Sequence, residues 1–252
     1  NFENLSLSDT IHQSHNFSGS LSLTAVEYDS GTTIDGASIT ATLGPGQQLV
    51  LDSITDGDTA SASLSDGGII IAQSASLNQV DLVLDDVGPA TSIPNENVFI
   101  DIAGTGVANA KITSGNDSFV VISNSGGALT SLELLGTGSM ALGTLPTSIT
   151  NVNGAAAAAN LTLTIGSGAN NIVGGTGDDA ITLTGGTNIV NTGDGNDTIT
   201  VSNVEEVNLG GGDDLAVVSG ESFAHQTDRM TISGTVADGE DFTATVNGTT
   251  VT

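Results

Sequence analysis

Short runs in which apolar and polar residues alternate occur along the whole chain, and glycine, aspartate, asparagine or proline separates them. The alternation is clear at residues 5–8, 21–24, 37–43 and 80–84. A period of two is typical of β-strands with one buried face, and the separating residues are typical of turns. No segment has the period of an amphipathic helix, and we expect the alanine run 155–159 to be a bend or a packed strand edge. The pattern therefore predicts an all-β protein.

Prolines and strand spacing suggest how the chain divides. Two of the four prolines lie within residues 87–95, which we take as a boundary. We expect residues 1–95 to form a β-sandwich-like or irregular β module. The spacing of later strands predicts a β-solenoid over residues 96–221, with strands at 98–102, 119–122, 131–135, 148–152 and 161–165. Residues 222–252 are predicted to form β-hairpins, with an Asn-Gly turn at 247, that cap the solenoid or leave a strand free for assembly.

Three segments repeat glycine and aspartate at nearly equal intervals. Residues 174–182 have the sequence GGTGDDAIT, residues 192–200 have TGDGNDTIT, and residues 209–217 have LGGGDDLAV. They align on Asp179, Asp197 and Asp214, at intervals of 18 and 17 residues. An isolated Gly-Asp run is most simply a solvated turn. Three such runs in register, each followed by alternating β-formers, instead favour one coil of a parallel β-roll per interval.

The repeat resembles the pattern G-G-x-G-x-D-x-U-x of the RTX family of calcium-binding β-roll proteins, of the kind found in bacterial surface-layer proteins and type I-secreted adhesins. In that family the first six residues form a turn whose carbonyls and aspartates hold Ca²⁺, and the U residue of the following strand points inward. The resemblance implies an RTX-like calcium-binding section over residues 166–217. Ca²⁺ takes roughly six to eight oxygen ligands, and glycine allows a tight turn to present its carbonyls. The candidate metal ligands are Asp178, Asp179, Asp194, Asn196, Asp197, Asp213, Asp214, Gly175, Gly177, Gly193, Gly195, Gly210 and Gly212.

Three acidic turns enclose two spaces, so we expect two well-bound Ca²⁺ ions. The terminal repeat departs from the family pattern, because Leu209 replaces its first glycine and Ala216 its bulky inward residue. The intervening turns carry Asn170 and Asn188 at the aspartate position. We therefore expect the opposite edge of the roll to stack asparagines or to loop out, so that calcium binds along one edge only.

A further turn at residues 114–119 shares the spacing of the repeat. Gly115, Asp117 and Phe119 fall at the equivalent positions, but no matching turn follows 18 residues later. The segment is equally compatible with a calcium turn and with a plain turn.

Charge restricts the partners. The formal net charge is −27, and Lys111 and Arg229 are the only basic residues. Nucleic acid and anionic membrane surfaces are disfavoured, because both are bound through clusters of Lys and Arg. No run of about 18 apolar residues predicts membrane insertion. The chain has no cysteine, which excludes disulfides and thiolate metal sites. Divalent cations are the expected counter-charge.

No motif predicts an enzyme. The chain lacks a zincin motif, a nucleophile elbow and a phosphate-binding loop. His12 and His15 are most simply a loop pair without a metal. Glu205 and Glu206 are adjacent, and alternation in a strand would place them on opposite faces. Ice binding would need regular threonine ladders, and in the sequence the threonines follow no single strand position for long.

These features predict an extracellular calcium-binding structural protein at the bacterial cell surface, of the surface-layer, adhesin or matrix-fibre kind. We expect it to fold on binding Ca²⁺ and to self-associate, with a cell-surface glycan as a further candidate partner. The first residues lack both a start methionine and a signal peptide, which suggests a processed product or a fragment. The alternative function is a C-terminal RTX secretion and folding module of a larger type I-secreted enzyme or toxin.

Overall fold

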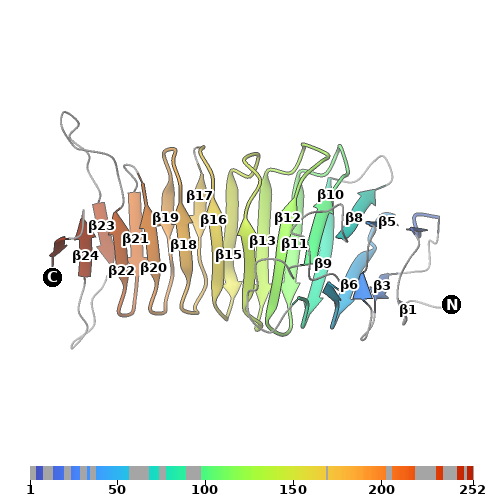
Figure 1. The fold of residues 1–252 in the computed structure, drawn as a ribbon, viewed down its shortest axis with the longest axis horizontal. Coiled ribbons are helices and arrows are strands. Elements are labelled where there is room, and N and C mark those ends of the chain that lie inside the picture. Colours follow the sequence, from blue (N-terminus) through green and yellow to red (C-terminus); the bar gives the residue numbers. More distant parts are fainter. Residues whose placement is uncertain are drawn as a thin grey trace.

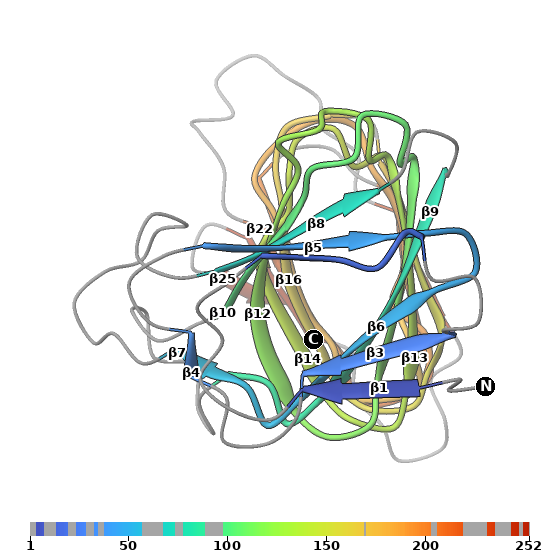
Figure 2. The same ribbon diagram turned by 90° about the vertical axis from the view of Figure 1, so that its right-hand side faces the viewer.

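The described strands wind into one elongated parallel β-solenoid (Figure 1). The structure, a computed structural model, describes residues 4–7, 14–19, 24–28, 33–34, 38–56, 68–73, 78–88, 98–168, 170–202, 206–218, 231–234, 243–246 and 249–251. Most strands alternate between two large sheets, which we call sheet I and sheet II, and Figure 2 looks along the axis of the stack. The described residues contain no helix, and so none long and apolar enough to cross a membrane. The predicted all-β solenoid is confirmed.

Sheet I has 11 strands, all paired in parallel with their neighbours. They are β1 (Asn4–Leu7), β3 (Ala25–Tyr28), β6 (Gln48–Asp52), β9 (Gln79–Asp85), β11 (Asn109–Ser114), β13 (Ser131–Gly136), β15 (Asn151–Ala157), β17 (Asn171–Val173), β19 (Ile189–Asn191), β21 (Glu206–Gly210) and β23 (Thr231–Gly234).

Sheet II has 12 strands, and only its last pair is antiparallel. They are β2 (His15–Asn16), β5 (Ile39–Leu43), β8 (Gly68–Gln73), β10 (Val98–Ile102), β12 (Ser118–Ser123), β14 (Met140–Thr144), β16 (Leu161–Ile165), β18 (Ala180–Leu183), β20 (Thr198–Val201), β22 (Leu215–Val218), β24 (Thr243–Val246) and β25 (Thr249–Val251). A separate small pair joins β4 (Thr33–Ile34) to β7 (Thr55–Asp56).

The core lies between the two sheets and is built from the inward residues of each strand. β16, for example, buries Leu161, Leu163 and Ile165, and turns Thr162 and Thr164 outward. The same alternation recurs in the paired strands, so aliphatic side chains stack from coil to coil. Each coil thus covers the apolar surface of its neighbour, which a single coil could not bury alone.

The solenoid continues across residues 87–95, where the prolines predict a boundary. In sheet I β9 pairs with β11, and in sheet II β8 pairs with β10. The described strands before residue 95 therefore belong to the same parallel stack and do not form a separate sandwich. They are less regular, because the offset between neighbouring coils is 31 residues at Asn78 and Asn109 but 18 at Asp179 and Asp197.

Several predicted strands agree with the observed ones. The strands at 98–102 and 161–165 match β10 and β16, whereas β15 begins three residues later than predicted and takes in the alanines up to Ala157. In the tail, β24 and β25 form the predicted hairpin, with Val246 paired to Thr249. β23 and β24 also pair in parallel with β21 and β22, so the tail adds a coil to the solenoid.

Candidate metal centre

The three acidic turns lie above one another along one edge of the solenoid. Each connects a sheet I strand to a sheet II strand: β17 to β18, β19 to β20, and β21 to β22. The following strands pair in register, with Ala180 opposite Thr198 and Thr198 opposite Leu215. Asp179, Asp197 and Asp214, which we call the inner column, therefore occupy the same position in three successive coils.

The inner column is buried and hydrogen-bonded along the solenoid axis. Asp179, Asp197 and Asp214 are 1 %, 1 % and 8 % exposed. The main-chain N–H of Asp179 donates to Oδ1 of Asp197 at 2.8 Å, and the N–H of Asp197 donates to Oδ1 of Asp214 at 2.9 Å. Leu161, one coil earlier, donates its N–H to Oδ1 of Asp179 at 2.8 Å. Each carboxylate thus binds the main chain of the preceding coil.

A second, exposed column lies beside the first and runs in the opposite sense. This outer column contains Asp178, Asn196 and Asp213. The N–H of Asn196 donates to Oδ1 of Asp178 at 2.7 Å, and the N–H of Asp213 donates to Oδ1 of Asn196 at 2.9 Å. Asn160 begins the column by accepting the N–H of Asp178 at 2.9 Å. Together the two columns clamp every coil step in both directions.

Glycine is required in these turns because neighbouring main chains approach closely. Gly195 has φ +119°, and a Cβ there would lie 2.3 Å from the carbonyl oxygen of Gly177. Gly212 has φ +134°, and its Cβ would lie 1.8 Å from the carbonyl oxygen of Gly195. Gly193 and Gly210 also have positive φ and equally close carbonyls. The repeated glycines therefore aim carbonyl oxygens from one turn towards the next.

The carboxylate of Asp197 is the least satisfied group of the site. Its Oδ2 is buried and has no hydrogen-bond partner. The Thr192 hydroxyl lies close enough to lower the pKa of Asp197, but it donates its hydrogen to the carbonyl of Leu209 at 2.7 Å. Burial is the dominant effect and raises the pKa of Asp197 to about 6, with smaller upward contributions from Asp179 and Asp214.

Asp179 shares this environment with better compensation. Burial raises its pKa, while the N–H groups of Gly175 and Leu161 lower it. Its Oδ2 accepts the N–H of Gly175 at 2.8 Å. The inner column thus holds stacked carboxylates in a site that disfavours their charge, and a bound cation would offset this cost.

The donor set consists of hard oxygens, which suits Ca²⁺ rather than a softer metal. No group of three or more His, Cys, Asp or Glu side chains surrounds a single point in the described part of the chain. A calcium site here would combine an inner carboxylate with outer-column oxygens and turn carbonyls. The carbonyls of Gly177 and Gly195 face the following coil. Asp194 is exposed and pairs only through a main-chain bridge to Gly211.

The opposite edge carries asparagines in place of aspartates, as predicted. Asn170 and Asn188 are 6 % and 1 % exposed. Nδ2 of Asn170 donates to Oδ1 of Asn188 at 2.7 Å, and Nδ2 of Asn188 donates to the carbonyl of Gly185 at 3.1 Å. This neutral pair holds its edge without a charge, so the stacked carboxylates are confined to one edge of these coils.

The turn at residues 114–119 lies on the acidic edge, between β11 and β12. Oδ1 of Asp117 accepts the N–H of Ser139 at 2.9 Å, across an offset of 22 residues. Asp117 thus continues the hydrogen-bonding pattern of the outer column, and its partner turn is displaced because this coil is longer. Asn160 also belongs to this edge and was not a candidate, although its place two residues before Thr162 parallels that of Asp178 before Ala180.

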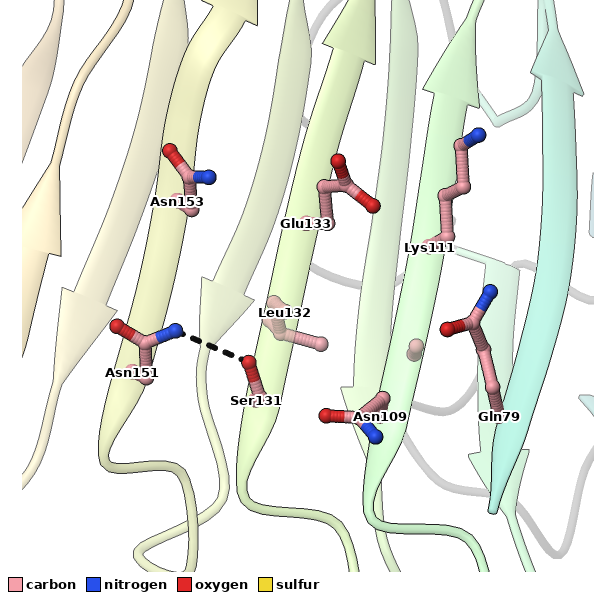
Figure 3. A pocket seen from close by; sticks show the side chains of 9 residues that line it. Gln79, Asn109, Lys111, Ser131, Leu132, Glu133, Asn151 and Asn153 are labelled. Carbon is pink, nitrogen blue, oxygen red and sulfur yellow. Dashed lines mark hydrogen bonds between the residues drawn. The ribbon is translucent and has the colours of Figure 1, made fainter.

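A polar groove crosses the outer face of sheet I (Figure 3). It has a volume of about 200 Å³ and is lined by Gln79, Asn109, Ala110, Lys111, Ser131, Leu132, Glu133, Asn151 and Asn153. Lys111 pairs in register with Asp81 on one side and Glu133 on the other, and no ion pair joins it to either carboxylate. Nδ2 of Asn151 donates to the Ser131 hydroxyl at 3.0 Å. The groove therefore offers one cation among amides and hydroxyls.

The histidines form no metal site within the described residues. His15 stacks on Phe17, with ring centroids 5.7 Å apart, and is tilted against Tyr28 at 6.3 Å. His12 and His225 lie outside the described residues, as does Glu205.

No protein-family profile matches the chain, and searches of curated proteins and of solved structures give no significant match. The chain's own residues carry the assignment that follows.

Proposed function

We propose that the acidic edge is an RTX-like calcium site and that the chain is an extracellular structural protein that calcium locks into its folded form. The observation that carries this proposal is the carboxylate of Asp197, which is buried between two further carboxylates with Oδ2 unpartnered. A buried charged oxygen without a partner is costly, and it persists where a ligand completes it. Two Ca²⁺ ions, one on each side of Asp197, would complete the column.

The charge of the column explains why calcium would control folding. Neighbouring strands in a sheet are about 4.8 Å apart, and two carboxylates at that distance repel by about 3 kcal/mol at an effective dielectric of about 20. A divalent cation between them reverses the sign. Extracellular calcium modules bind at about 10⁻⁴ to 10⁻³ M, so a chain of this kind stays loosely folded in a low-calcium cytosol and folds after export.

The experiment is a comparison of calcium-loaded and calcium-depleted protein. We expect thermal unfolding, followed by far-UV circular dichroism, to shift to higher temperature with millimolar CaCl₂, and atomic emission to detect two bound ions per chain. Equal concentrations of MgCl₂ serve as the control, because Mg²⁺ prefers rigid octahedral sites and keeps its waters. Unfolding that is the same in CaCl₂ and in EDTA would contradict the proposal.

Self-association is the second part of the proposal. The last described pair, β24 and β25, ends the solenoid with strands whose outer edge is open to another chain. Calcium bridging between acidic edges offers a second route to a sheet or fibre. Negative-stain microscopy at millimolar CaCl₂ should show ordered assemblies, and monomers alone would exclude assembly of this chain.

The alternative is that the chain serves as the C-terminal secretion and folding module of a larger enzyme or toxin. Both functions use the same calcium turns, so calcium binding does not separate them. The sequence of the complete gene product does, because a catalytic domain preceding these residues would favour the module.

The sheet I groove supports a glycan as an additional partner of a surface protein. Amide and hydroxyl side chains on four adjacent strands can bind sugar hydroxyls, and the unpaired Lys111 ammonium can bind a sugar carboxylate. We expect an oligogalacturonate to bind and a neutral glucan oligosaccharide to bind more weakly in calorimetry. The variant Lys111→Gln should lose the preference for the acidic sugar, while Asp213→Asn, on the opposite part of the coil, should retain it.

A further inference from the structure

Threonines on the outer face of sheet II stack in register, although their spacing along the chain conceals this. Thr144 pairs with Thr164, Thr164 with Thr182, and Thr182 with Thr200. A second row, two residues earlier in each strand, contains Thr162, Ala180 and Thr198. We call the six residues of these rows on β16, β18 and β20 the threonine face, namely Thr162, Thr164, Ala180, Thr182, Thr198 and Thr200.

The outer face of sheet II is free of charge around these rows. The half-buried and exposed outward residues of β14 to β22 are Ala141, Gly143, Thr144, the threonine face, Leu215 and Val217, and none of them is ionisable. Over the neighbouring strands, sheet I exposes Lys111, Glu133 and Glu206. The strand preference of threonine explains its presence in a sheet. It does not explain why one face excludes charge in a chain with 29 acidic residues.

The hydroxyls of the threonine face are also uncommitted. Thr130, Thr150 and Thr192 lie in turns, and each hydroxyl donates to a carbonyl of a neighbouring coil. None of the hydroxyls of the threonine face makes a hydrogen bond within the described part of the chain. The face therefore presents rows of methyl groups and free hydroxyls at a constant spacing.

The spacing and flatness of the face select a periodic ligand. Neighbouring coils are about 4.8 Å apart, and alternate residues of a strand are about 6.6 Å apart, so the face is a regular two-dimensional grid. Viewed along the axis, the coils from β12 to β22 overlie one another with little rotation (Figure 2). We propose that the threonine face binds ice, with hydroxyls entering the hydrogen-bonded lattice and methyl groups resting against its surface.

Other occupants fit this face less well. A second copy would bring together two chains of net charge −27 and would bury small threonines, whereas protein interfaces depend on aromatic and large side chains. Nucleic acids and anionic lipids need cations, which the described part of sheet II lacks. Ice carries no charge and repeats in two dimensions, as the face does.

The test uses the whole chain in CaCl₂, with folding checked by circular dichroism, so that a loss of ice binding is distinguished from a loss of the solenoid. The wild-type protein should be enriched in a slowly growing ice hemisphere relative to the liquid, and should inhibit ice recrystallisation. The variant Thr182→Lys places a charge at the centre of the face and should abolish both effects. The matched control Asn153→Lys places the same charge on the exposed face of sheet I and should leave both unchanged.

Three outcomes would overturn the proposal. The first is exclusion of the folded wild-type protein from growing ice to the same extent as serum albumin. The second is equal ice enrichment for wild type and a natively folded Thr182→Lys variant. The third is a dimer in sedimentation velocity that Thr182→Lys dissociates while the wild type shows no affinity for ice, which would assign the face to self-association.

Discussion

The main-chain N–H of Asp179 donates to Oδ1 of Asp197 across one coil, at 2.8 Å, while Oδ2 of Asp197 is buried without a partner. One oxygen of this carboxylate therefore holds the solenoid together, and the other is left for a ligand. The same residue has a pKa raised to about 6, chiefly by burial. Structural and metal-binding roles meet in one side chain, and four predictions depend on this edge and its counterpart.

The pH dependence of stability should have opposite signs with and without calcium. An acid whose pKa is raised on folding contributes most stability below its unfolded pKa, and this contribution is lost as pH rises through the folded value. For Asp197 the loss occurs between about pH 4 and pH 6. Calcium-depleted protein should melt at a higher temperature at pH 5 than at pH 7.5. Calcium needs ionised carboxylates, so the gain in melting temperature from CaCl₂ should increase over the same interval.

The variant Asp197→Asn should raise the stability of the calcium-depleted protein and remove most of the response to calcium. An amide oxygen can still accept the N–H of Asp179, and it carries no charge to desolvate. Calcium at about 100 times its dissociation constant stabilises by about 2.7 kcal/mol per site, which the variant should lose at both neighbouring sites. Urea unfolding with CaCl₂ or EDTA measures this. Glu133→Gln, which removes an exposed charge far from the turns, should behave as wild type; a wild-type calcium response in Asp197→Asn would exclude Asp197 as a ligand.

The variant Gly195→Ala should destabilise the folded protein by at least about 1–2 kcal/mol, the cost of a left-handed conformation for an L-residue. The added Cβ would also lie 2.3 Å from the carbonyl oxygen of Gly177. Gly211→Ala is the matched control, because a Cβ there meets only the Asp194 side chain at 3.4 Å. Chemical denaturation in CaCl₂ compares the two, and equal stabilities would show that the turn relaxes more freely than its packing implies.

The variant Asn188→Ala should cost about 1–3 kcal/mol, because it leaves buried Nδ2 of Asn170 without its acceptor. The loss should be the same in CaCl₂ and in EDTA, since the opposite edge carries no carboxylate at this step. Asn171→Ala removes an exposed amide and should have little effect. A loss that appears only in CaCl₂ would instead place the asparagine edge in the calcium site.

Much of the fold could be predicted from the sequence, because the information is local and repeated. The alternation of Leu161 to Ile165 predicts a strand with one buried face, and the intervals between Asp179, Asp197 and Asp214 predict one coil each. Register follows from these intervals, and so does the asparagine pair at Asn170 and Asn188. These conclusions need only chain spacing and the period of a strand.

The early coils were harder to predict, because long connections hide the coil length. The prolines of residues 87–95 suggest a boundary, yet β9 and β11 pair directly, as do β8 and β10. Asp117 has no equivalent after 18 residues, but its partner turn lies 22 residues away. The hydrophobic pairing of strands across coils decided this arrangement, and no local signal records it.

The sequence by itself determined that this chain is all-β, strongly acidic and built on a glycine and aspartate repeat, because composition and period are properties of the chain alone. Only the tertiary structure decided which carboxylate oxygens are buried, which glycines face a neighbouring carbonyl, and which threonines share a row. Thr144, Thr164 and Thr182 are spaced unequally along the chain but lie side by side in sheet II. The physical reason is that burial and register arise between coils, where residues distant in sequence come into contact.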